Sequence, residues 1–223
     1  MEIIDYPDAE LMMIDLANRI AGELRQALAR GGRAALAVPG GTTPGPVFDT
    51  LSGVDLDWGR VDVLPTDERW VPESSPRSNA ALIRRRLLTD RAAAARFVPL
   101  HAPAAAPEER LAELSAAVAA VLPLTVLLLG MGEDMHVASI FAGGDRLAEA
   151  LHGEAVLVAM RAPAAPEPRV TLSAGVLRGA MHRHIVITGT AKRRALEAAR
   201  TLVPEQAPVA AVLRGATVHW AEG

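Results

Sequence analysis

The chain contains the stretch Leu124-Thr125-Val126-Leu127-Leu128-Leu129-Gly130-Met131-Gly132-Glu133-Asp134-Met135-His136-Val137-Ala138-Ser139-Ile140-Phe141. Its apolar first third is typical of a buried parallel strand, because such strands lack polar alternation. Glycines then permit a sharp turn, and an acid and a histidine, Asp134 and His136, follow directly. We expect this pair at the carboxyl edge of a sheet, close to the start of the next helix, where open α/β sheets bind ligands. A capping acid beside a surface histidine has the same pattern, so this stretch alone leaves catalysis open.

The composition excludes several classes of protein. The 223 residues carry a formal net charge of −3 and only 3% are aromatic, so the chain lacks the basic stripe and stacking surfaces of nucleic-acid-binding proteins. With no cysteine, it has no disulfide, thiolate nucleophile or thiolate metal site. The N-terminus has no basic leader, and no apolar run approaches the roughly 20 residues of a membrane span. We therefore expect one cytoplasmic domain over residues 1–223, with no membrane or nucleic-acid partner.

Hydrophobic spacing alternates along the chain between the helical and the strand period. It predicts helices near residues 8–30, 47–51, 79–88, 108–121, 174–180, 190–201 and 208–214, and strands near 34–38, 60–65, 96–100, 124–129, 155–160, 184–188 and 217–220. This alternation predicts an α/β fold of three layers, αβα, with a mostly parallel Rossmann-like sheet and helices on both faces. The Pro- and Ala-rich residues 161–168 are expected to form a mobile loop or lid. His101, His152, His182 and His219 are expected to be loop, helix or surface residues.

Polar side chains follow four of the expected strands: Thr42 and Thr43, Asp67 and Arg69, Asp134 and His136, and Lys192. Parallel strands end at a common edge, so these groups should converge there. The loop around Gly40 and Gly41 is a candidate phosphate cradle, because glycines allow close approach and backbone N–H groups meet at a helix start. It lacks the lysine of a nucleotide P-loop. Among 23 basic residues only Lys192 is a lysine, and its place in the first turn of a helix favours an anion nearby.

Several catalytic motifs are absent. There is no Gly-x-Ser-x-Gly elbow and no His-Glu-x-x-His metal motif, and Met135 interrupts the dinucleotide-binding fingerprint. We therefore expect no metal and no nicotinamide cofactor. The remaining imidazole, carboxylates and anion site suit proton transfer or water activation on a small phosphorylated molecule.

Five segments, in order, carry a family resemblance: Gly40-Gly41-Thr42-Thr43-Pro44; Asp67-Glu68-Arg69-Trp70-Val71-Pro72 with Ser78-Asn79; Gly130 to Phe141; Arg169-Val170-Thr171-Leu172; and Gly189 with Lys192. Together they resemble the 6-phosphogluconolactonase family, within the superfamily that includes glucosamine-6-phosphate deaminase. The resemblance covers essentially the whole chain. It implies hydrolysis of 6-phosphogluconolactone without a cofactor, in the oxidative pentose phosphate route, with a small sugar phosphate as the binding partner.

The resemblance also implies roles for individual residues. His136 would be the general base that activates water, Asp134 would orient or tune it, and Arg69 would hold substrate or oxyanion charge. The residues implied in substrate and phosphate binding are Gly40, Gly41, Thr42, Thr43, Asp67, Arg169 and Lys192. Asp134 and His136 are two positions apart and would face opposite ways on a regular helix, so their cooperation requires an irregular turn.

The chain departs from the family pattern at four positions: Pro39 for serine, Met135 for glycine, Val137 for threonine and Ala142 for proline. If the backbone at Met135 needs a positive φ, methionine bears strain there that glycine would not. Its side chain could also crowd the pocket. Two alternatives stay open: an amino-sugar-phosphate isomerase or deaminase, and a sugar-phosphate-binding module without catalysis. Arg69 and the segment Ala138–Phe141 favour the lactonase over the deaminase.

Overall fold

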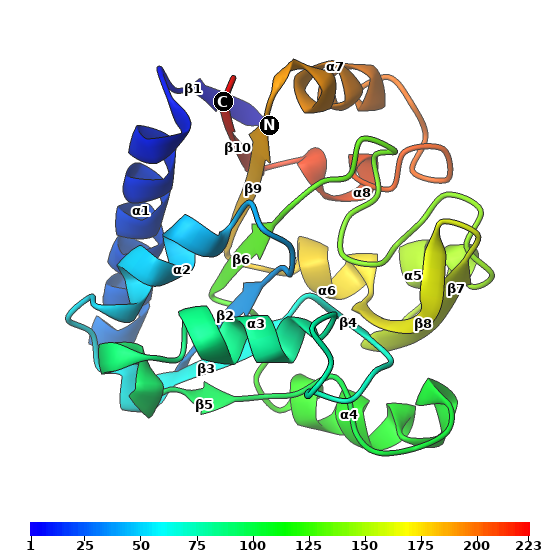
Figure 1. Ribbon diagram of the computed structural model, residues 1–223, viewed down its shortest axis with the longest axis horizontal. Coiled ribbons are helices and arrows are strands. Elements are labelled where there is room, and N and C mark those ends of the chain that lie inside the picture. Colours follow the sequence, from blue (N-terminus) through cyan, green and yellow to red (C-terminus); the bar gives the residue numbers. More distant parts are fainter.

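The computed structural model describes residues 1–223 and is built around a seven-stranded parallel sheet (Figure 1). The strand order is β1-β10-β9-β6-β2-β3-β5, and every neighbouring pair is parallel. The strands are β1 (Glu2–Asp5), β2 (Ala34–Val38), β3 (Val61–Pro65), β5 (Arg96–Phe97), β6 (Val126–Leu129), β9 (His182–Thr188) and β10 (Thr217–Ala221). The predicted three-layer α/β fold is confirmed.

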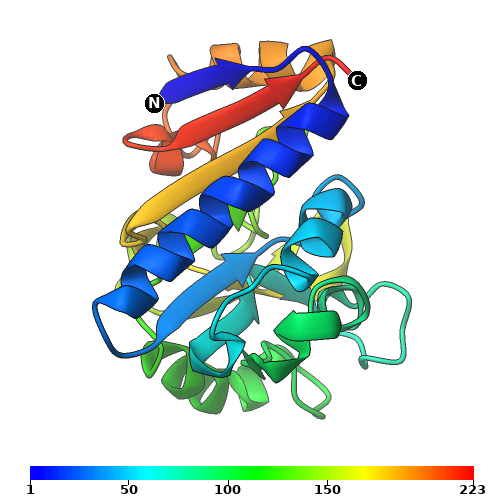
Figure 2. The ribbon, with the colours of Figure 1, turned by 90° about the vertical axis from the view of Figure 1, so that its left-hand side faces the viewer.

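Helices cover both faces of this sheet. One face carries α1 (Ala9–Ala29), α2 (Gly45–Ser52) and α3 (Asn79–Arg86); Figure 2 shows α1 lying across the strands. Helices α4 (Leu111–Ala119), α5 (Leu147–His152), α6 (Ala174–Arg178), α7 (Thr190–Ala199) and α8 (Ala210–Leu213) contribute to the core of the other face. None of these helices combines the length and the apolar character that crossing a bilayer requires.

Strand β6 lies at the centre of the sheet and shows why its sequence is apolar throughout. Val126 and Leu128 pack into the core beneath α1 and α2, whereas Leu127 and Leu129 pack into the core on the opposite face. Both faces of the strand are therefore buried, and alternation with polar residues would place polar groups in a core.

A second, three-stranded antiparallel sheet contains β4 (Asp67–Arg69), β8 (Ala165–Leu172) and β7 (Leu157–Ala162), in that order. The predicted lid at residues 161–168 is wrong, because most of that segment lies in the β7–β8 hairpin, where Ala162 pairs with Ala165. Arg161 also forms an ion pair with Glu108 at 2.6 Å. Pro166 and Pro168 lie between the Met160–Arg169 and Ala162–Ala165 pairs, where the pairing of β7 with β8 shifts register, and proline is tolerated at such irregularities.

Local signals set several element boundaries. The carboxylate of Asp8 accepts the N–H of Leu11 at 2.7 Å and begins α1, and Ser78 caps α3 in the same way. The expectation that Asp134 and His136 lie close to the start of the next helix is wrong, since α5 begins only at Leu147. Strand β1, an exposed edge strand, was not expected from the sequence.

The expectation that His219 is a loop, helix or surface residue is wrong, because it is fully buried in β10 beneath α1. Tyr6 donates to Asp15 at 2.5 Å, so its oxygen accepts from Nδ1 of His219 at 2.9 Å. Nε2 of His219 lies 3.0 Å from Nδ1 of His184, whose other nitrogen lies 2.9 Å from Glu23. Burial lowers the pKa of His219 to about 3. The histidine is therefore neutral in the folded protein at moderately acidic pH.

This burial predicts acid sensitivity. A histidine of the unfolded chain titrates near 6.5, so between about pH 6.5 and 3 the unfolded state binds one more proton than the folded state. In this range His219 should therefore lower the free energy of unfolding by about 1.4 kcal/mol for each unit by which the pH is lowered. Urea unfolding at several pH values should show that slope reduced in His219→Gln and retained in His152→Gln, whose ring pairs with Glu205 on the surface. An equal slope in both variants would contradict the assignment.

Candidate functional site

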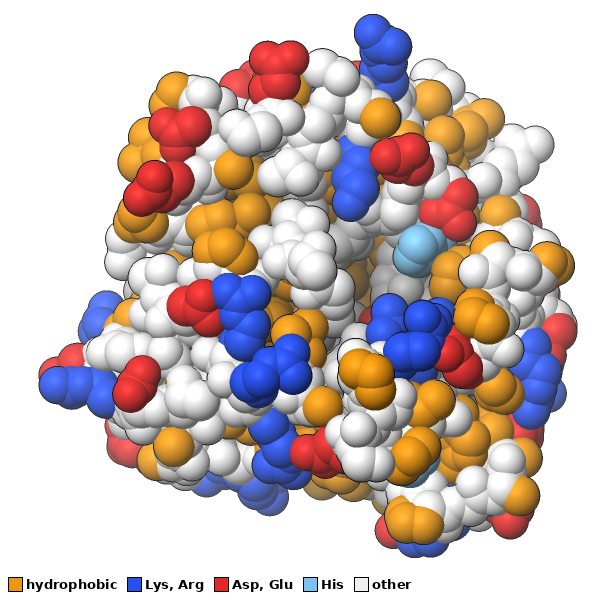
Figure 3. Space-filling view, in the orientation of Figure 1, with side chains coloured by type: hydrophobic (Ala, Val, Ile, Leu, Met, Phe, Trp, Pro, Cys, Tyr) orange, Lys and Arg blue, Asp and Glu red, His pale blue; other side chains and the backbone are white.

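The carboxyl ends of the strands surround a pocket of about 290 Å³. Figure 3 shows this hollow, bordered by basic side chains and a histidine. Of the predicted site residues, those that line it are Gly40, Gly41, Thr42, Thr43, Asp67, Arg69, His136, Arg169 and Lys192. Asp134 does not line the pocket but contacts the ring of His136. The sequence therefore identified residues that the fold brings together from five separate segments.

The pocket lies where the direction of the chain across the sheet reverses. Strand β2 pairs with both β3 and β6, and β6 pairs on its other side with β9. The chain therefore leaves β2 toward one edge of the sheet and leaves β6 toward the other. The two loops diverge above the sheet and leave a crevice, which is the usual ligand site of open α/β sheets.

The loop after β2 presents unpaired donors to the pocket. The backbone N–H groups of Gly40, Gly41, Thr42 and Thr43 donate to no other group of the protein. Gly41 has φ +86°, and a Cβ at Gly40 would collide with the side chain of Asn79. The close approach of Asn79 thus favours glycine at Gly40, and the positive φ favours it at Gly41. The convergent N–H groups form a concavity suited to an anion.

The loop after β6 holds Asp134 and His136 in an irregular turn, as their spacing required. Nδ1 of His136 lies 2.5 Å from Oδ1 of Asp134, and Nε2 has no partner in the protein. A carboxylate at this distance favours the tautomer with the proton on Nδ1, which leaves Nε2 free to accept a proton. A Cβ at Gly132 would collide with both side chains, so this glycine makes room for the pair.

Two arginines lie side by side at the pocket. Arg69 on β4 pairs across the second sheet with Arg169 on β8, and the Nε atoms of both are buried without a hydrogen-bond partner. Burial, together with the neighbouring charge of Arg69, lowers the pKa of Arg169. Arg169 is only 7% exposed. Two crowded cations with unused donors favour binding of an anion.

Lys192 supplies a third cation from the first turn of α7. It forms no ion pair, whereas its neighbour Arg193 pairs with Asp5 and Arg200 of the same helix pairs with Glu197 at 2.7 Å. A lysine without a carboxylate partner beside unpaired N–H groups is consistent with the predicted anion site.

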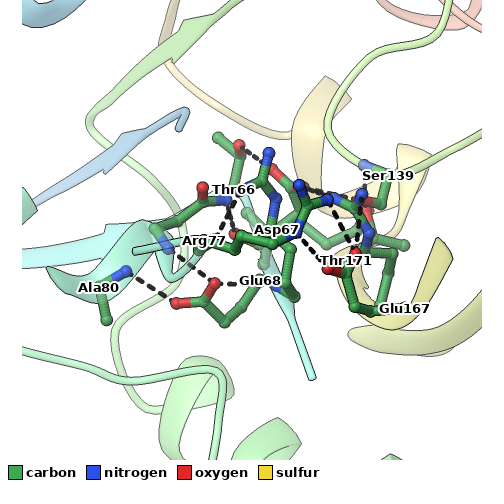
Figure 4. A network of polar contacts seen from close by, with 12 residues as sticks. Thr66, Asp67, Glu68, Arg77, Ala80, Ser139, Glu167 and Thr171 are labelled. Carbon is green, nitrogen blue, oxygen red and sulfur yellow. Dashed lines mark hydrogen bonds and ion pairs between the residues drawn. The ribbon is translucent and has the colours of Figure 1, made fainter. Parts of the chain in front are cut away.

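Asp67 has a different environment from the other predicted ligands. It is 6% exposed; its Oδ1 accepts from Thr66 at 3.0 Å and its Oδ2 from Ser139 at 2.6 Å (Figure 4). The next residue, Glu68, accepts N–H groups of Arg69, Asn79 and Ala80 at 2.7–2.8 Å. Burial nevertheless raises the pKa of Glu68.

Sequence reasoning missed part of this network. Ser139 accompanies the His136 segment and Thr171 the Arg169 segment, but neither was assigned a role. Ser139 donates its N–H to Thr171 Oγ1 at 3.1 Å. Glu68 lies in a charged triplet that also reads as a solvated loop, and only the fold places it against the start of α3. No group of three or more His, Cys, Asp or Glu residues lies close enough to hold a metal ion.

Comparisons of the sequence and of the structure with known proteins point to the same family. The family model described as glucosamine-6-phosphate isomerases/6-phosphogluconolactonase matches residues 7–220. A 6-phosphogluconolactonase of Pseudomonas aeruginosa is 45% identical over 216 residues, 92% of this chain and 88% of the relative. One of Mesorhizobium japonicum is 42% identical over 223 residues, 97% and 93% of the two chains. The crystal structure of a 6-phosphogluconolactonase from Shewanella baltica matches with a TM-score of 0.92 at 30% identity, covering 99% and 97% of the chains.

Met135 occupies the left-handed region, with φ 65°. Its carbonyl accepts the N–H of Val209 at 3.0 Å, and its side chain packs partly against the core, while Val137 is fully buried. The methionine thus adopts a conformation that glycine would adopt without strain, at a cost of about 1–2 kcal/mol.

Two substitutions separate this strain from packing. Met135→Gly and Met135→Ala both remove the side chain, but only alanine keeps a Cβ at positive φ. In urea unfolding the glycine variant should be more stable by about 1 kcal/mol. Met13, buried in the second turn of α1, is the matched control. At this helical position Met13→Ala should be more stable than Met13→Gly by about 1 kcal/mol. If the alanine variant were the more stable at Met135 as well, the backbone at Met135 would be unstrained.

Proposed function

This chain belongs to the glucosamine-6-phosphate isomerase/6-phosphogluconolactonase family, and we propose that it hydrolyses 6-phospho-D-glucono-1,5-lactone to 6-phospho-D-gluconate in the oxidative pentose phosphate route. The observation that carries the proposal is the ring of His136. Asp134 fixes one nitrogen at 2.5 Å, and the other is free at a pocket lined by Arg69, Arg169 and Lys192. The proposal includes a cytoplasmic location, which suits a chain without cysteine.

The reaction adds water across the lactone ester. In our proposal Nε2 of His136 takes a proton from water as the oxygen attacks the carbonyl carbon. The bond from that carbon to the ring oxygen then breaks, and the imidazolium returns the proton to the ring oxygen. Asp134 stabilises the imidazolium between these steps. Arg69 stabilises the negative charge that develops on the carbonyl oxygen. The product acid ionises and releases one proton.

The 6-phosphate would be held away from the reacting carbonyl. Lys192, Arg169 and the unpaired N–H groups of the Gly40–Thr43 loop supply the donors that a phosphate accepts. Binding of the phosphate away from the carbonyl orients the carbonyl against His136, and the phosphate itself takes no part in the chemistry.

An isomerase or deaminase would need a carboxylate or similar base to move protons between carbon atoms of the sugar. Asp67 is the buried carboxylate at the pocket, and both of its oxygens already accept hydrogen bonds from hydroxyl groups. The imidazole of His136, oriented by Asp134, instead supplies a base for water, and this pair supports the lactonase over that alternative.

His136→Ala tests the proposed base. Freshly generated lactone opens unaided, so the rate of acid release is measured with the spontaneous rate subtracted. The variant should lose about 10²- to 10⁴-fold in kcat, because a general base acts in the transition state. Its affinity for 6-phosphogluconate, measured by calorimetry, should change little. His152→Ala, at a surface histidine outside the pocket, serves as the control and should keep full activity.

The outcomes are distinct. A wild-type protein that binds 6-phosphogluconate without accelerating hydrolysis would be a binding module, and the proposed function would be wrong. Loss of product affinity in His136→Ala would instead assign His136 to anion binding.

Lys192→Ala should act mainly on binding. Loss of a charge-assisted contact to phosphate costs about 1.5–3 kcal/mol, so KM should rise roughly 10-fold or more with a smaller change in kcat. Arg194→Ala removes an exposed charge from the same helix outside the pocket and is the matched control. Equal KM values in the two variants would remove Lys192 from the phosphate site.

A further inference from the structure

The loop that carries His136 depends on contacts from outside itself. Residues 130–146, between β6 and α5, form no helix and none of the named strands. Met135 and Ala138 both have positive φ, 65° and 50°. Such conformations cost on the order of 1–3 kcal/mol each and persist only where the surroundings enforce them. The groups that fix this loop therefore also fix the imidazole.

Three hydrogen bonds tie residues 130–141 to other elements. Val209 donates its N–H to the carbonyl of Met135 at 3.0 Å, and Ser139 donates its N–H to Thr171 Oγ1 at 3.1 Å. The third runs from the Ser139 hydroxyl to Oδ2 of Asp67 at 2.6 Å, and the hydroxyl is completely buried. Only this one ends on a charged group, and hydroxyl–carboxylate bonds of this length are about twice as strong as neutral ones.

Asp67 lines the pocket, but both of its oxygens are engaged by hydroxyl groups of the protein. Oδ1 of Asp67 accepts the hydroxyl of Thr66 at 3.0 Å. The nearest guanidinium nitrogen of Arg169 lies 4.0 Å from Oδ2, the oxygen that accepts from Ser139. The carboxylate thus joins the end of β3, the His136 loop and β8. Figure 4 shows Asp67 between Thr66 on one side and Ser139 on the other.

We propose that Ser139 and Asp67 are positioning residues, whose hydroxyl–carboxylate bond holds the His136 loop against β4 and so sets the imidazole relative to Arg69. The inference rests on the proposed lactonase function. It gives Asp67 a role other than the substrate contact that the family resemblance implies. The carboxylate acts through the loop, and each of its oxygens is engaged by a hydroxyl group of the protein.

Four variants test the pair: Ser139→Ala, Asp67→Ala, Asp67→Asn and the double variant Ser139→Ala/Asp67→Ala. Ser139→Ala should lower kcat about 10- to 100-fold, the loss expected from a displacement of the base by about 1 Å, with KM changed less than about threefold. Asp67→Ala should lose as much, and the double alanine variant should lose little more, because both changes break the same bond. Asp67→Asn keeps an oxygen that accepts the Ser139 hydroxyl, so it should restore most of kcat.

A matched control separates positioning from general loss of stability. Ser173 is also buried, and its hydroxyl caps α6 by accepting the N–H of Val176. Ser173→Ala should lose about 1 kcal/mol of stability and keep kcat. The histidine ring resonances give a readout independent of activity. The His136 signal, identified by its absence in His136→Ala, should shift in Ser139→Ala and stay in place in Ser173→Ala.

The possible results separate this inference from the proposed function. A wild type without lactonase activity overturns the proposed function, and the His136 resonance then decides the positioning role. If the wild type is active, an unchanged kcat and an unchanged His136 signal in Ser139→Ala overturn the inference. Asp67→Asn as inactive as Asp67→Ala would also overturn it, in favour of direct proton transfer by Asp67.

Discussion

The pairing of β2 with β6 is the constraint on which the site depends. These neighbouring parallel strands lead to opposite edges of the sheet, so the loops that follow them diverge above their carboxyl ends. One loop presents unpaired N–H groups and the other presents His136. The apolar sequence of β6, buried on both faces, secures this arrangement from within the core. The strand order therefore determines where the two loops meet, and the side chains on these loops determine the chemistry of the site.

Electrostatics then distinguishes this edge from the rest of the surface. Most arginines outside the pocket have a carboxylate nearby, as Arg33 and Arg96 have Asp62. At the pocket Lys192 forms no ion pair. Arg69 and Arg169 are crowded together with buried, unused Nε atoms, and the carboxylates nearest to Arg169 lie 3.9–4.0 Å away. Crowding of like charges costs free energy that a bound anion would offset. A doubly charged phosphate and a carbonyl that gains charge in the transition state are the anionic partners that the proposed reaction supplies.

Much of the fold was predictable because its signals are local. The run Ala34–Val38 ends at glycines, and Asp8 caps the first helix, so both boundaries follow from adjacent residues. Most of the candidate site residues could be proposed because they follow an expected strand, whereas Arg169 was proposed only from the family resemblance. Contacts between distant segments were not predictable in this way. Ser139 and Asp67 are separated by 72 positions, and residues 161–168 take strand structure only through pairing within a hairpin. The burial of His219 likewise depends on α1, which lies far from it in the sequence.

In the proposed mechanism the phosphate binds at Lys192 and the Gly40–Thr43 loop, and the reacting carbon lies at His136, all of which line the same pocket. A crystal structure of the protein with 6-phosphogluconate measures this directly. We expect phosphate oxygens within hydrogen-bond distance of Lys192 Nζ and of the loop N–H groups, and the product carboxylate beside Nε2 of His136. A reversed orientation, with the phosphate against His136, or a product bound outside this pocket would contradict the account.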